Sequence, residues 1–323
     1  MRRVRYYAHG GPEVLTVEEA AIPEPGPGQV LIRTEAIGLN YLDALLRRQT
    51  SRDSIYYRDL PASLTGDVVG TVTRTGDDTD PALAGTRVAV LLEDACAEYV
   101  VADTSWLVSV PAALDAGAAS VLPTMGAVAL GALRTARIAA GETVLVTAAA
   151  GGIGHLAVQL ARQLGAGTVI GAVGSASKSD FLKELGVDIV ADYSQPDWAD
   201  QVRRAAPGGV DVVLDAVGAG TLLECIALLA PFGRVAAYGA ADGTWGSVPV
   251  LSLAALKTLS AFSLMAWRAA APERARGDIG ELTRSLQSGE LRAVVTTLPL
   301  AEVASAHRSF EERGVLGRVV LTV

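Results

Sequence analysis

A run of small residues near the middle of the chain has the composition of a nucleotide-binding turn. The segment from Glu142 to Gly154 reads Glu-Thr-Val-Leu-Val-Thr-Ala-Ala-Ala-Gly-Gly-Ile-Gly and contains the pattern Ala149-x-Gly151-x-x-Gly154. This pattern is the dinucleotide fingerprint with alanine in the first glycine position. Ala149 permits a tight turn, Gly151 lets the backbone approach a pyrophosphate, and Gly154 lets a helix pack closely on a strand.

The residues on either side predict the elements that hold this turn. Residues 143–148 begin with a short apolar run rich in β-branched residues, which is typical of a parallel strand covered on both faces. His155 to Leu164 has helical periodicity, and the N-terminus of such a helix offers free N–H groups and a positive dipole to phosphates. We therefore expect the cofactor phosphates to meet Ala149, Gly151, Gly152, Ile153 and Gly154.

Composition limits the class of protein. The chain has 323 residues, which favours two domains, and half of them are hydrophobic, as in a compact globular enzyme. A net charge of −8 argues against nucleic acid or an anionic membrane as the main partner. The N-terminal arginines precede no apolar core, and the most apolar segment, Leu251 to Trp267, is interrupted by Lys257 and serines. We expect that segment to be a buried helix and the protein to be cytoplasmic.

The order of the elements predicts the architecture. Residues 1 to about 111 have the pattern of short strands and turns, and an alanine-rich helical region broken by Pro123 follows. From Gly141 strands alternate with helices, which indicates a doubly wound parallel sheet of the Rossmann type in an α/β protein. The expected strands are 143–148, 168–173, 188–191, 211–215 and 233–239. The expected domains are a β-rich domain (1–123), a cofactor-binding domain (124–258) and a returning segment (259–323).

The end of the second expected strand indicates which nicotinamide cofactor is bound. An NAD site usually places Asp or Glu there, about 20 residues after the glycines, to bind the ribose 2′-hydroxyl. This chain has Val-Gly-Ser-Ala-Ser-Lys over 173–178, without a carboxylate that would repel a 2′-phosphate. Ser175 can hydrogen-bond that phosphate and Lys178 can neutralise it, although Lys178 is otherwise an ordinary residue of a first helical turn. The sequence therefore predicts NADPH.

Several motifs in order resemble one known family over nearly the whole chain. They are His9 to Leu15 (His-Gly-Gly-Pro-Glu-Val-Leu), Gly38 to Asp43 (Gly-Leu-Asn-Tyr-Leu-Asp) and Ala148 to Gly154. Together they resemble the zinc-independent NADPH:quinone oxidoreductase branch of the medium-chain dehydrogenase/reductase superfamily. The resemblance implies a GroES-like catalytic domain and a homodimer that pairs near Gly246 to Leu251. It also implies that Tyr193 lines the 2′-phosphate pocket.

The sequence predicts no metal. Zinc-dependent relatives carry a catalytic Cys near position 40 and Gly-His-Glu near position 66, where this chain has Asn40 and Thr65-Gly66-Asp67. The two cysteines and three histidines are scattered singly, and no structural-zinc lobe is present. The expected roles of these residues are ordinary. His9 is placed in a turn, His155 at a helix start, His307 on a helix surface, and Cys96 is expected to be a buried, unreactive thiol.

Without a Lewis acid, conjugated acceptors suit the site better than alcohols, because the charge that develops in reduction is delocalised. The resemblance implies that Asn40, Tyr41, Asp43 and Arg47 line the substrate cleft near the nicotinamide. Asn40 would donate an amide hydrogen bond, Tyr41 would stack on a flat substrate or supply a proton, and Asp43 would orient its neighbours. The alternative is a polar strand-to-helix connection in which Asn40 caps the helix.

The sequence leaves the acceptor open. Gly126 stands where relatives often have Thr, with Thr124 nearby, and residues 91–96 form a short acidic segment where relatives often have a loop that contains Gly-Tyr. The first hypothesis is hydride transfer from NADPH to a quinone. One alternative is reduction of a conjugated C=C bond in a 2-alkenal, an enone or an enoyl thioester, as in secondary metabolism. A second alternative is a protein that binds NADPH without enzymatic activity.

Overall fold

The computed structural model describes residues 1–323, which form two compact units. The first unit contains Met1–Thr124 and Ala293–Val323, and the second contains Met125–Arg292. The chain leaves the first unit close to the expected position but returns at Ala293. Residues 259–292 were expected in the catalytic domain and instead belong to the cofactor-binding unit, so that prediction was 34 residues too early.

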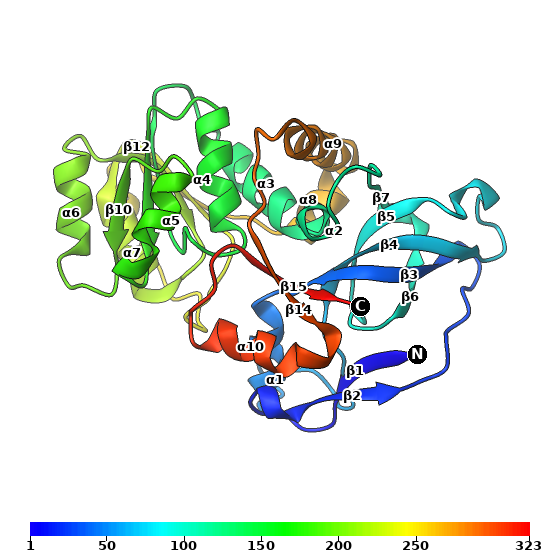
Figure 1. Ribbon diagram of the computed structural model, residues 1–323. Coiled ribbons are helices and arrows are strands. Elements are labelled where there is room, and N and C mark those ends of the chain that lie inside the picture. The colour runs from blue at the N-terminus through cyan, green and yellow to red at the C-terminus, as the bar shows by residue number, and fades with distance from the viewer. The chain divides into compact units, whose positions relative to one another are not determined.

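The second unit is built on a six-stranded parallel sheet (Figure 1). Its order is β10-β9-β8-β11-β12-β13, which is 3-2-1-4-5-6 in chain order and therefore the doubly wound arrangement that the sequence predicted. The strands are β8 (Thr143–Val146), β9 (Thr168–Val173), β10 (Ile189–Asp192), β11 (Val210–Asp215), β12 (Leu229–Ala237) and β13 (Thr258–Ala261). β8 ends two residues earlier than expected, because Ala148 has a positive φ of 48° and cannot continue a strand.

Helices cover both faces of this sheet. α6 (Trp198–Ala205) and α7 (Ala219–Leu228) pack on one face, where Trp198 and Ile226 join Leu145, Ile170 and Val213 in one buried cluster. α3 (Ala127–Thr135) and α4 (Gly154–Gln163) pack together and against the strands, and the short α5 (Ser179–Glu184) contacts β10. Because the strands are buried on both faces, their sequences are apolar runs without alternation.

The segment after β12 departs from the sequence expectation. Leu251 to Trp267 was expected to be a buried helix, but it contains a 3-10 turn (Val250–Leu253), β13 and the start of α8 (Leu264–Ala270). Val250 and Leu251 are more than four-fifths exposed. The segment forms a strand instead of a helix because β13 pairs with β12 as a parallel edge strand, with Arg234 opposite Thr258. Local apolarity alone did not reveal the open sheet edge.

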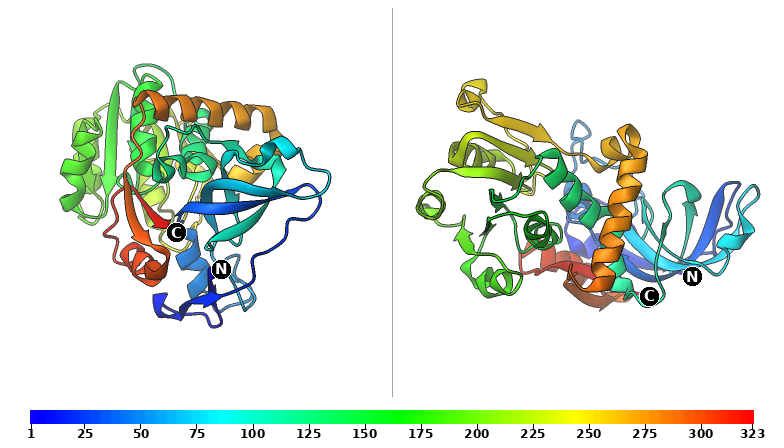
Figure 2. Two further views of the ribbon diagram at one scale, coloured as in Figure 1. Left: turned by 45° about the vertical axis from the view of Figure 1, so that its right-hand side comes forward. Right: turned by 90° about the horizontal axis from the view of Figure 1, so that it is seen from above.

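Helix α9 (Pro272–Ser288) explains why the chain stays in the second unit so long (orange in Figure 2). It packs against α3, and Arg134 of α3 pairs with both Asp278 and Glu281 of α9. The ring of Phe262 lies directly against Gly131, where any side chain on α3 would overlap it. These contacts join residues more than a hundred positions apart, so local sequence patterns do not show them.

The first unit contains a seven-stranded sheet and a separate two-stranded ribbon. The sheet order is β14-β15-β3-β4-β5-β7, and β6 also pairs with β3. The C-terminal strand lies antiparallel beside β3, with Val320 opposite Gly38 (Figure 1). The elements are β1 (Arg2–Tyr6), β2 (Leu15–Glu19), β3 (Gln29–Gly38), α1 (Leu42–Arg48), β4 (Gly66–Thr75), β5 (Arg87–Leu92), β6 (Tyr99–Asp103), β7 (Val108–Ser109), α2 (Ala116–Ala119), β14 (Val295–Pro299), α10 (Val303–Glu311) and β15 (Arg318–Thr322).

The apolar stretch between the two units is a core element. Ala116–Thr135 is the one stretch long and apolar enough to cross a membrane by length and composition, and 83% of its window is buried inside the protein. It consists of α2, a π-helical turn at Leu122–Gly126 and α3. The break expected at Pro123 falls within that π-helical turn. This degree of burial is typical of a helix in the core of a folded protein.

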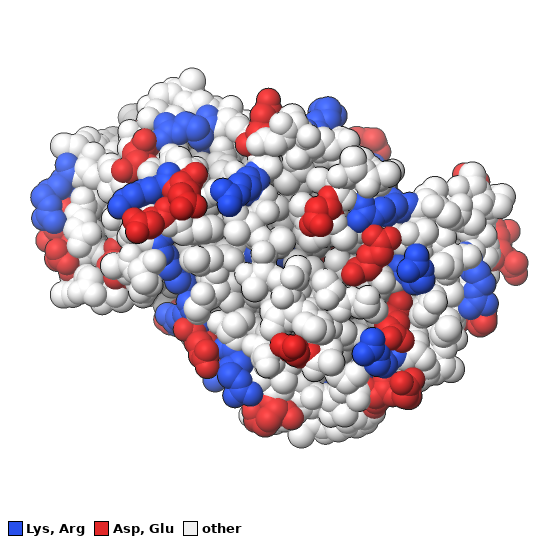
Figure 3. All heavy atoms as spheres, in the orientation of Figure 1, with Lys and Arg blue, Asp and Glu red and all other residues white.

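The charged residues are dispersed. On the face drawn in Figure 3, Lys and Arg side chains alternate with Asp and Glu side chains and form no broad area of one sign. Many of them pair, such as Arg5 with Asp94 and Arg2 with Glu98. A mixed surface on a chain of net charge −8 does not resemble the basic surface that polyanions require.

Candidate active site

The glycine-rich turn joins β8 to α4 at the carboxyl edge of the parallel sheet. The N–H of Ala149 donates to the carbonyl of Ala172 at 3.0 Å, and the N–H of Gly151 donates to Ala148 at 2.9 Å. A Cβ atom on Gly154 would overlap the Ala148 carbonyl oxygen and lie 2.7 Å from the Cα of Ala149. Gly154 is therefore required for the close approach of helix and turn.

The start of α4 is open to a ligand. Ile153 is its N-cap residue, and its side chain makes no capping hydrogen bond. The N–H groups of His155 and Leu156 already donate to the carbonyls of Gly151 and Ile153 at 3.0 and 3.1 Å, so an anion would meet the N–H groups just before them, from Gly152 to Gly154. His155 lies in the first turn of α4, as expected, and its Nδ1 is 2.9 Å from the Gly151 carbonyl oxygen. These features fit a pyrophosphate at this end of the helix.

The end of β9 has the polar composition that the sequence indicated. Ser175 caps the 3-10 turn Ala176–Lys178, its Oγ accepting from the N–H of Ser177 at 3.3 Å. Lys178 ends that turn and is partly exposed. The next acidic residue, Asp180, forms an exposed ion pair with Lys183. Along the chain after β9, a serine and a lysine therefore come before any carboxylate. Asp192, at the end of the adjacent strand β10, accepts hydrogen bonds from the N–H and the hydroxyl of Ser194.

Tyr193 reaches the same edge from the next strand. It follows β10 directly, and its N–H donates to the carbonyl of Val173 at 2.8 Å. Its ring lies 3.2 Å from the position of a Cβ on Gly174, and it meets Trp198 edge-on with centroids 6.5 Å apart. The structure thus brings Ser175, Lys178 and Tyr193 to the carboxyl ends of two adjacent strands.

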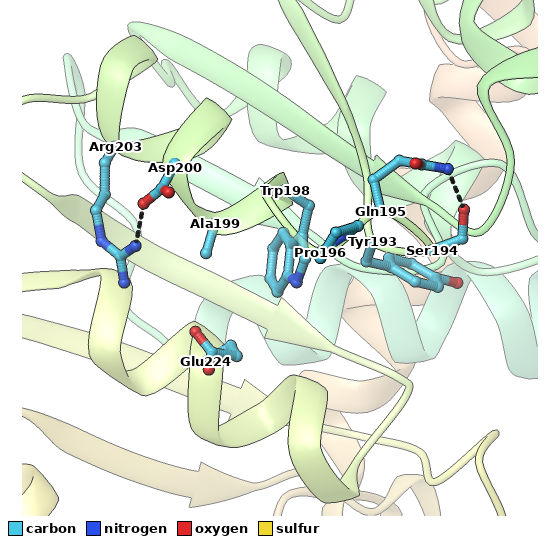
Figure 4. A pocket seen from close by; sticks show the side chains of 9 residues that line it. All are labelled: Tyr193, Ser194, Gln195, Pro196, Trp198, Ala199, Asp200, Arg203 and Glu224. Carbon is cyan, nitrogen blue, oxygen red and sulfur yellow. Dashed lines mark hydrogen bonds and ion pairs between the residues drawn. The ribbon is translucent and has the colours of Figure 1, made fainter.

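A pocket of about 380 Å³ opens beside this edge (Figure 4). The loop after β10, α6 and Glu224 of α7 line it, and Trp198 stands between the Asp200–Arg203 pair and Gln195. Among the residues that the sequence assigned to the cofactor, Tyr193 alone lines this pocket. The pocket therefore borders the predicted cofactor edge and does not include the glycine-rich turn.

Sequence reasoning missed two buried polar residues next to the turn. Thr147 and Asp215 are both fully buried, and the Thr147 hydroxyl donates to Asp215 Oδ1 at 2.8 Å. Burial raises the pKa of Asp215, while its hydrogen bonds from Thr147 and the Gly218 N–H oppose that rise. The available signal was an Asp that directly follows the apolar run 212–214, at the sheet edge where ligands bind.

The substrate-side candidates Asn40 and Tyr41 follow β3 and begin α1, and both are partly exposed. Tyr41 is the N-cap residue of α1, and no side-chain capping bond forms. The alternative role of Asn40 as the helix cap is therefore wrong. The backbone carbonyl of Asn40, and not its side chain, accepts from the N–H of Asp43. The amide of Asn40 is not used as a cap.

Asp43 is buried and holds a neighbouring loop. Its two carboxyl oxygens accept from the N–H and from the hydroxyl of Thr65, each at 2.8 Å. Burial raises the pKa of Asp43 to about 7, while the Thr65 hydrogen bonds and the Arg58 charge act in the opposite direction. Asp43 was expected to line the substrate cleft and to orient its neighbours. Its side chain is only 1% exposed, and the neighbour that it holds is Thr65.

Arg47 has a different environment from the one expected. It was expected to line the substrate cleft, but its side chain is fully buried. The guanidinium donates to the carbonyl of Gly10 and forms an ion pair with Glu311 of α10. Arg47 therefore fastens the N-terminal loop and α10 to α1, and its charge is already satisfied within the first unit.

His307 was expected on a helix surface, and that expectation is wrong because the side chain is fully buried on α10. Its ring nitrogens have no hydrogen-bond partner within the protein. Burial and the nearby Arg47 charge lower the pKa of His307 to about 3. Helical periodicity predicted that His307 lies in a helix, but it did not show which face of α10 is buried against the rest of the first unit.

These two groups predict opposing pH dependences of stability. Asp43 has a raised pKa in the folded protein, so its contribution to the free energy of unfolding falls as pH rises from 4 to 7. His307 has a lowered pKa, so its contribution to the free energy of unfolding falls as pH drops from 6.5 to 3. Each effect amounts to about 4 kcal/mol at about 1.4 kcal/mol per pKa unit. We expect His307→Gln to make the urea midpoint fall between pH 4.5 and 7.5, and Asp43→Asn to make it rise. Equal slopes in both variants would contradict this assignment.

The position that carries zinc ligands in metal-dependent relatives has another role here. Asp67 and Arg318 form a fully buried ion pair at 2.5 Å, and the Thr124 hydroxyl donates to Asp67 at 2.6 Å. Thr124 is thus committed to Asp67. No group of three or more His, Cys, Asp or Glu side chains gathers to hold a metal ion. Cys96 is buried as expected, and burial raises the pKa of its thiol.

Comparison with known proteins agrees with this architecture. Residues 26–112 match the alcohol dehydrogenase GroES-like domain, and residues 152–276 match the zinc-binding dehydrogenase family. A 2-haloacrylate reductase of Burkholderia is 33% identical over 97% of this chain and 96% of its own length. A quinone oxidoreductase of Pseudomonas aeruginosa is 32% identical over 99% of both chains. The structure of mycobacterial Rv1454c complexed with NADPH covers 100% of both chains, with TM-score 0.90 and 34% identity.

Fold, site and relatives together define a two-domain oxidoreductase with a Rossmann-like nucleotide-binding domain and a GroES-like domain. The chain belongs to the medium-chain dehydrogenase/reductase family, which the sequence motifs had indicated.

Proposed function

We propose that this protein transfers hydride from NADPH to a quinone without zinc. The observation that carries the cofactor assignment is the edge formed by Ser175, Lys178 and Tyr193, where the segment after β9 has no carboxylate before Asp180. The start of α4, which Gly154 lets pack closely on the turn, fits a pyrophosphate beside it. The NADPH complex of the mycobacterial relative supports the same assignment.

When bound, NADPH supplies the hydride, and the chain's residues bind, orient and protect the reacting groups. On this proposal, the turn from Ala149 to Gly154 holds the pyrophosphate. The N–H groups from Gly152 to Gly154 are the donors, because those of Ala149 and Gly151 already donate to backbone carbonyls. Asn40 donates a hydrogen bond to the acceptor oxygen, where negative charge develops. Tyr41 stacks on a flat acceptor or supplies a proton, and Asp43 keeps the loop at Thr65 in place.

Reduction of a conjugated C=C bond is the second candidate, because a 2-haloacrylate reductase is among the similar proteins. An enone, a 2-alkenal or an enoyl thioester would use the same cofactor and the same oxygen-binding donor. A protein that binds NADPH without turnover is the third candidate. The roles proposed for Asn40 and Tyr41 are the same in either reaction, so the acceptor must be determined by experiment.

Oxidation of NADPH by the purified protein is the deciding experiment, followed at 340 nm with benzoquinone, naphthoquinones, 2-alkenals, cyclic enones and a crotonyl thioester. Quinone-selective turnover, reduced by Asn40→Ala and Tyr41→Phe, is the expected result. Selectivity for enones or thioesters would replace the quinone proposal with the second candidate. Tight NADPH binding without turnover of any acceptor would favour the third.

Replacement of Lys178 tests the choice of cofactor. We expect Lys178→Ala to raise the Kd for NADPH about ten-fold while leaving the Kd for NADH unchanged, because on this proposal the 2′-phosphate is the part of the cofactor that the lysine binds. The matched control is Lys183→Ala, which removes an exposed lysine of α5 that already pairs with Asp180. Fluorescence titration with both nucleotides measures the effect. An equal loss of affinity for NADPH and NADH would contradict the assignment of Lys178 to the 2′-phosphate.

We also propose that the protein forms a homodimer through the open edge of the parallel sheet. β13 is the terminal strand of that sheet, and Val250 and Leu251 beside it are 84% and 83% exposed. Large exposed apolar side chains next to an unpaired strand favour pairing with another chain. Sedimentation should give about twice the 33.3 kDa monomer mass, and a monomer mass would contradict the proposal.

Both cysteines are free and buried, which supports a cytoplasmic location.

A further inference from the structure

The loops that follow β8 and β11 are joined by a closed network of buried hydrogen bonds. The Thr147 hydroxyl donates to Asp215 Oδ1 at 2.8 Å and accepts from the N–H of Ala216 at 2.9 Å. Asp215 also accepts from the N–H of Val217 at 3.3 Å and from the N–H of Gly218 at 2.9 Å. Thr147 and Asp215 are fully buried, so water does not replace any of these bonds.

This network lies where the sheet order reverses. β8 and β11 are neighbours in the sheet but are separated in the chain by two strands and three helices. In doubly wound folds ligands bind at this reversal, at the carboxyl ends of the strands. Thr147 is the residue just before Ala148, whose positive φ starts the glycine-rich turn. The position of Thr147 therefore decides where the turn begins.

The same network reaches a third loop. The N–H groups of Ala241 and Asp242 donate to the carbonyls of Ala216 and Val217 at 2.9 and 3.1 Å. The Tyr238 N–H donates to the Asp215 carbonyl at 2.8 Å. The hydroxyl of Tyr238 is buried without a partner, and burial raises its pKa, so it stays protonated at neutral pH. Three loops at one sheet edge thus take their positions from the segment that begins at Asp215.

We propose that Asp215 and Thr147 are positioning residues that hold the glycine-rich turn in the conformation that binds the cofactor pyrophosphate. They act through the backbone of the turn and do not contact the cofactor. The carboxylate of Asp215 is suited to this role because its two oxygens accept three hydrogen bonds at once. An asparagine could not accept all three in the same way, because its NH₂ group donates hydrogen bonds. This inference deepens the proposed function, because it assigns the geometry of the same NADPH site.

Nucleotide fragments separate this role from a general loss of structure. 2′,5′-ADP carries the 2′-phosphate that Ser175 and Lys178 are proposed to bind, but lacks the pyrophosphate bridge. We expect Thr147→Val to raise the Kd for NADPH about ten-fold and the KM for NADPH with it, while the Kd for 2′,5′-ADP stays within about two-fold. Thr147→Ser keeps the hydroxyl and should restore NADPH binding. Asp215→Asn should behave like Thr147→Val.

Hydrogen exchange gives a readout that does not depend on the cofactor. In Thr147→Val the amides of Ala149 and Gly151 should exchange about ten-fold faster, while the amide of Tyr193, at the far side of the same edge, keeps its rate. Equal weakening of NADPH and 2′,5′-ADP, or unchanged exchange at Ala149 and Gly151, would overturn the positioning role. If the wild-type protein fails to bind NADPH, the proposed function fails, and the exchange rates still decide whether Thr147 positions the turn.

Discussion

Alanine at position 154 is expected to raise the Kd for NADPH at least about ten-fold and to destabilise the second unit by about 1–3 kcal/mol. The added Cβ would overlap the Ala148 carbonyl oxygen and lie 2.7 and 2.8 Å from the Cα and carbonyl carbon of Ala149. These are backbone atoms, so no side chain can move aside. The turn must shift away from α4, and the N–H groups that face the pyrophosphate shift with it.

Two glycine variants serve as controls for Gly154→Ala. Gly277 lies in α9 with no atom near its Cβ position, so Gly277→Ala should leave NADPH binding unchanged and stabilise the helix slightly. Gly151→Ala should give an intermediate effect, because its Cβ would lie 3.3 Å from the Ala148 oxygen. Fluorescence titration and thermal melting measure the two effects. Unchanged NADPH affinity in Gly154→Ala would contradict the proposed position of the pyrophosphate.

The second large effect is expected at the buried ion pair of the first unit. Asp67→Asn should lower the free energy of unfolding by about 3–5 kcal/mol, because it leaves the Arg318 cation buried without a counter-charge. Arg318 Nε and Nη1 already lack hydrogen-bond partners, and the guanidinium lies directly against Gly38, where any Cβ would overlap it. The cation therefore has no room to turn toward another acceptor.

The double variant Asp67→Leu with Arg318→Met should recover much of that loss, because two apolar side chains remove both buried charges together. Lys183→Ala is the exposed counterpart, since its pair with Asp180 lies at the surface and should contribute less than about 1 kcal/mol. Urea unfolding of the three variants gives the comparison. A loss in Asp67→Asn no larger than that in Lys183→Ala would show that the pair is not important for stability.

The cofactor side of this protein was predictable because its signals are local. The pattern Ala149-x-Gly151-x-x-Gly154 directly follows a β-branched run and directly precedes a helical one, and strand, turn and helix are where it predicted them. The absence of a carboxylate over residues 173–178 is equally visible in the chain. Adjacent strands of a parallel sheet end at one edge, so Ser175 and Tyr193 could be expected there together.

The substrate side was less predictable because burial is a tertiary property. Arg47 and His307 belong to helices that the sequence located, but both helices pack against each other, so an expected cleft residue and an expected surface residue are fully buried. The edge strand β13 was missed for the same reason, since its pairing with β12 is not visible in local periodicity.

The sequence by itself determined the class of fold, the order of strands from β8 to β12, and the residues of the glycine-rich turn, because periodicity and small residues act over a few positions. Only the tertiary structure decided which polar side chains are buried and with whom they pair. Asp67 meets Arg318 across 251 positions, and Thr147 meets Asp215 across 68. A buried charge is stable only with a partner, and that partner is brought by the fold from a distant part of the chain.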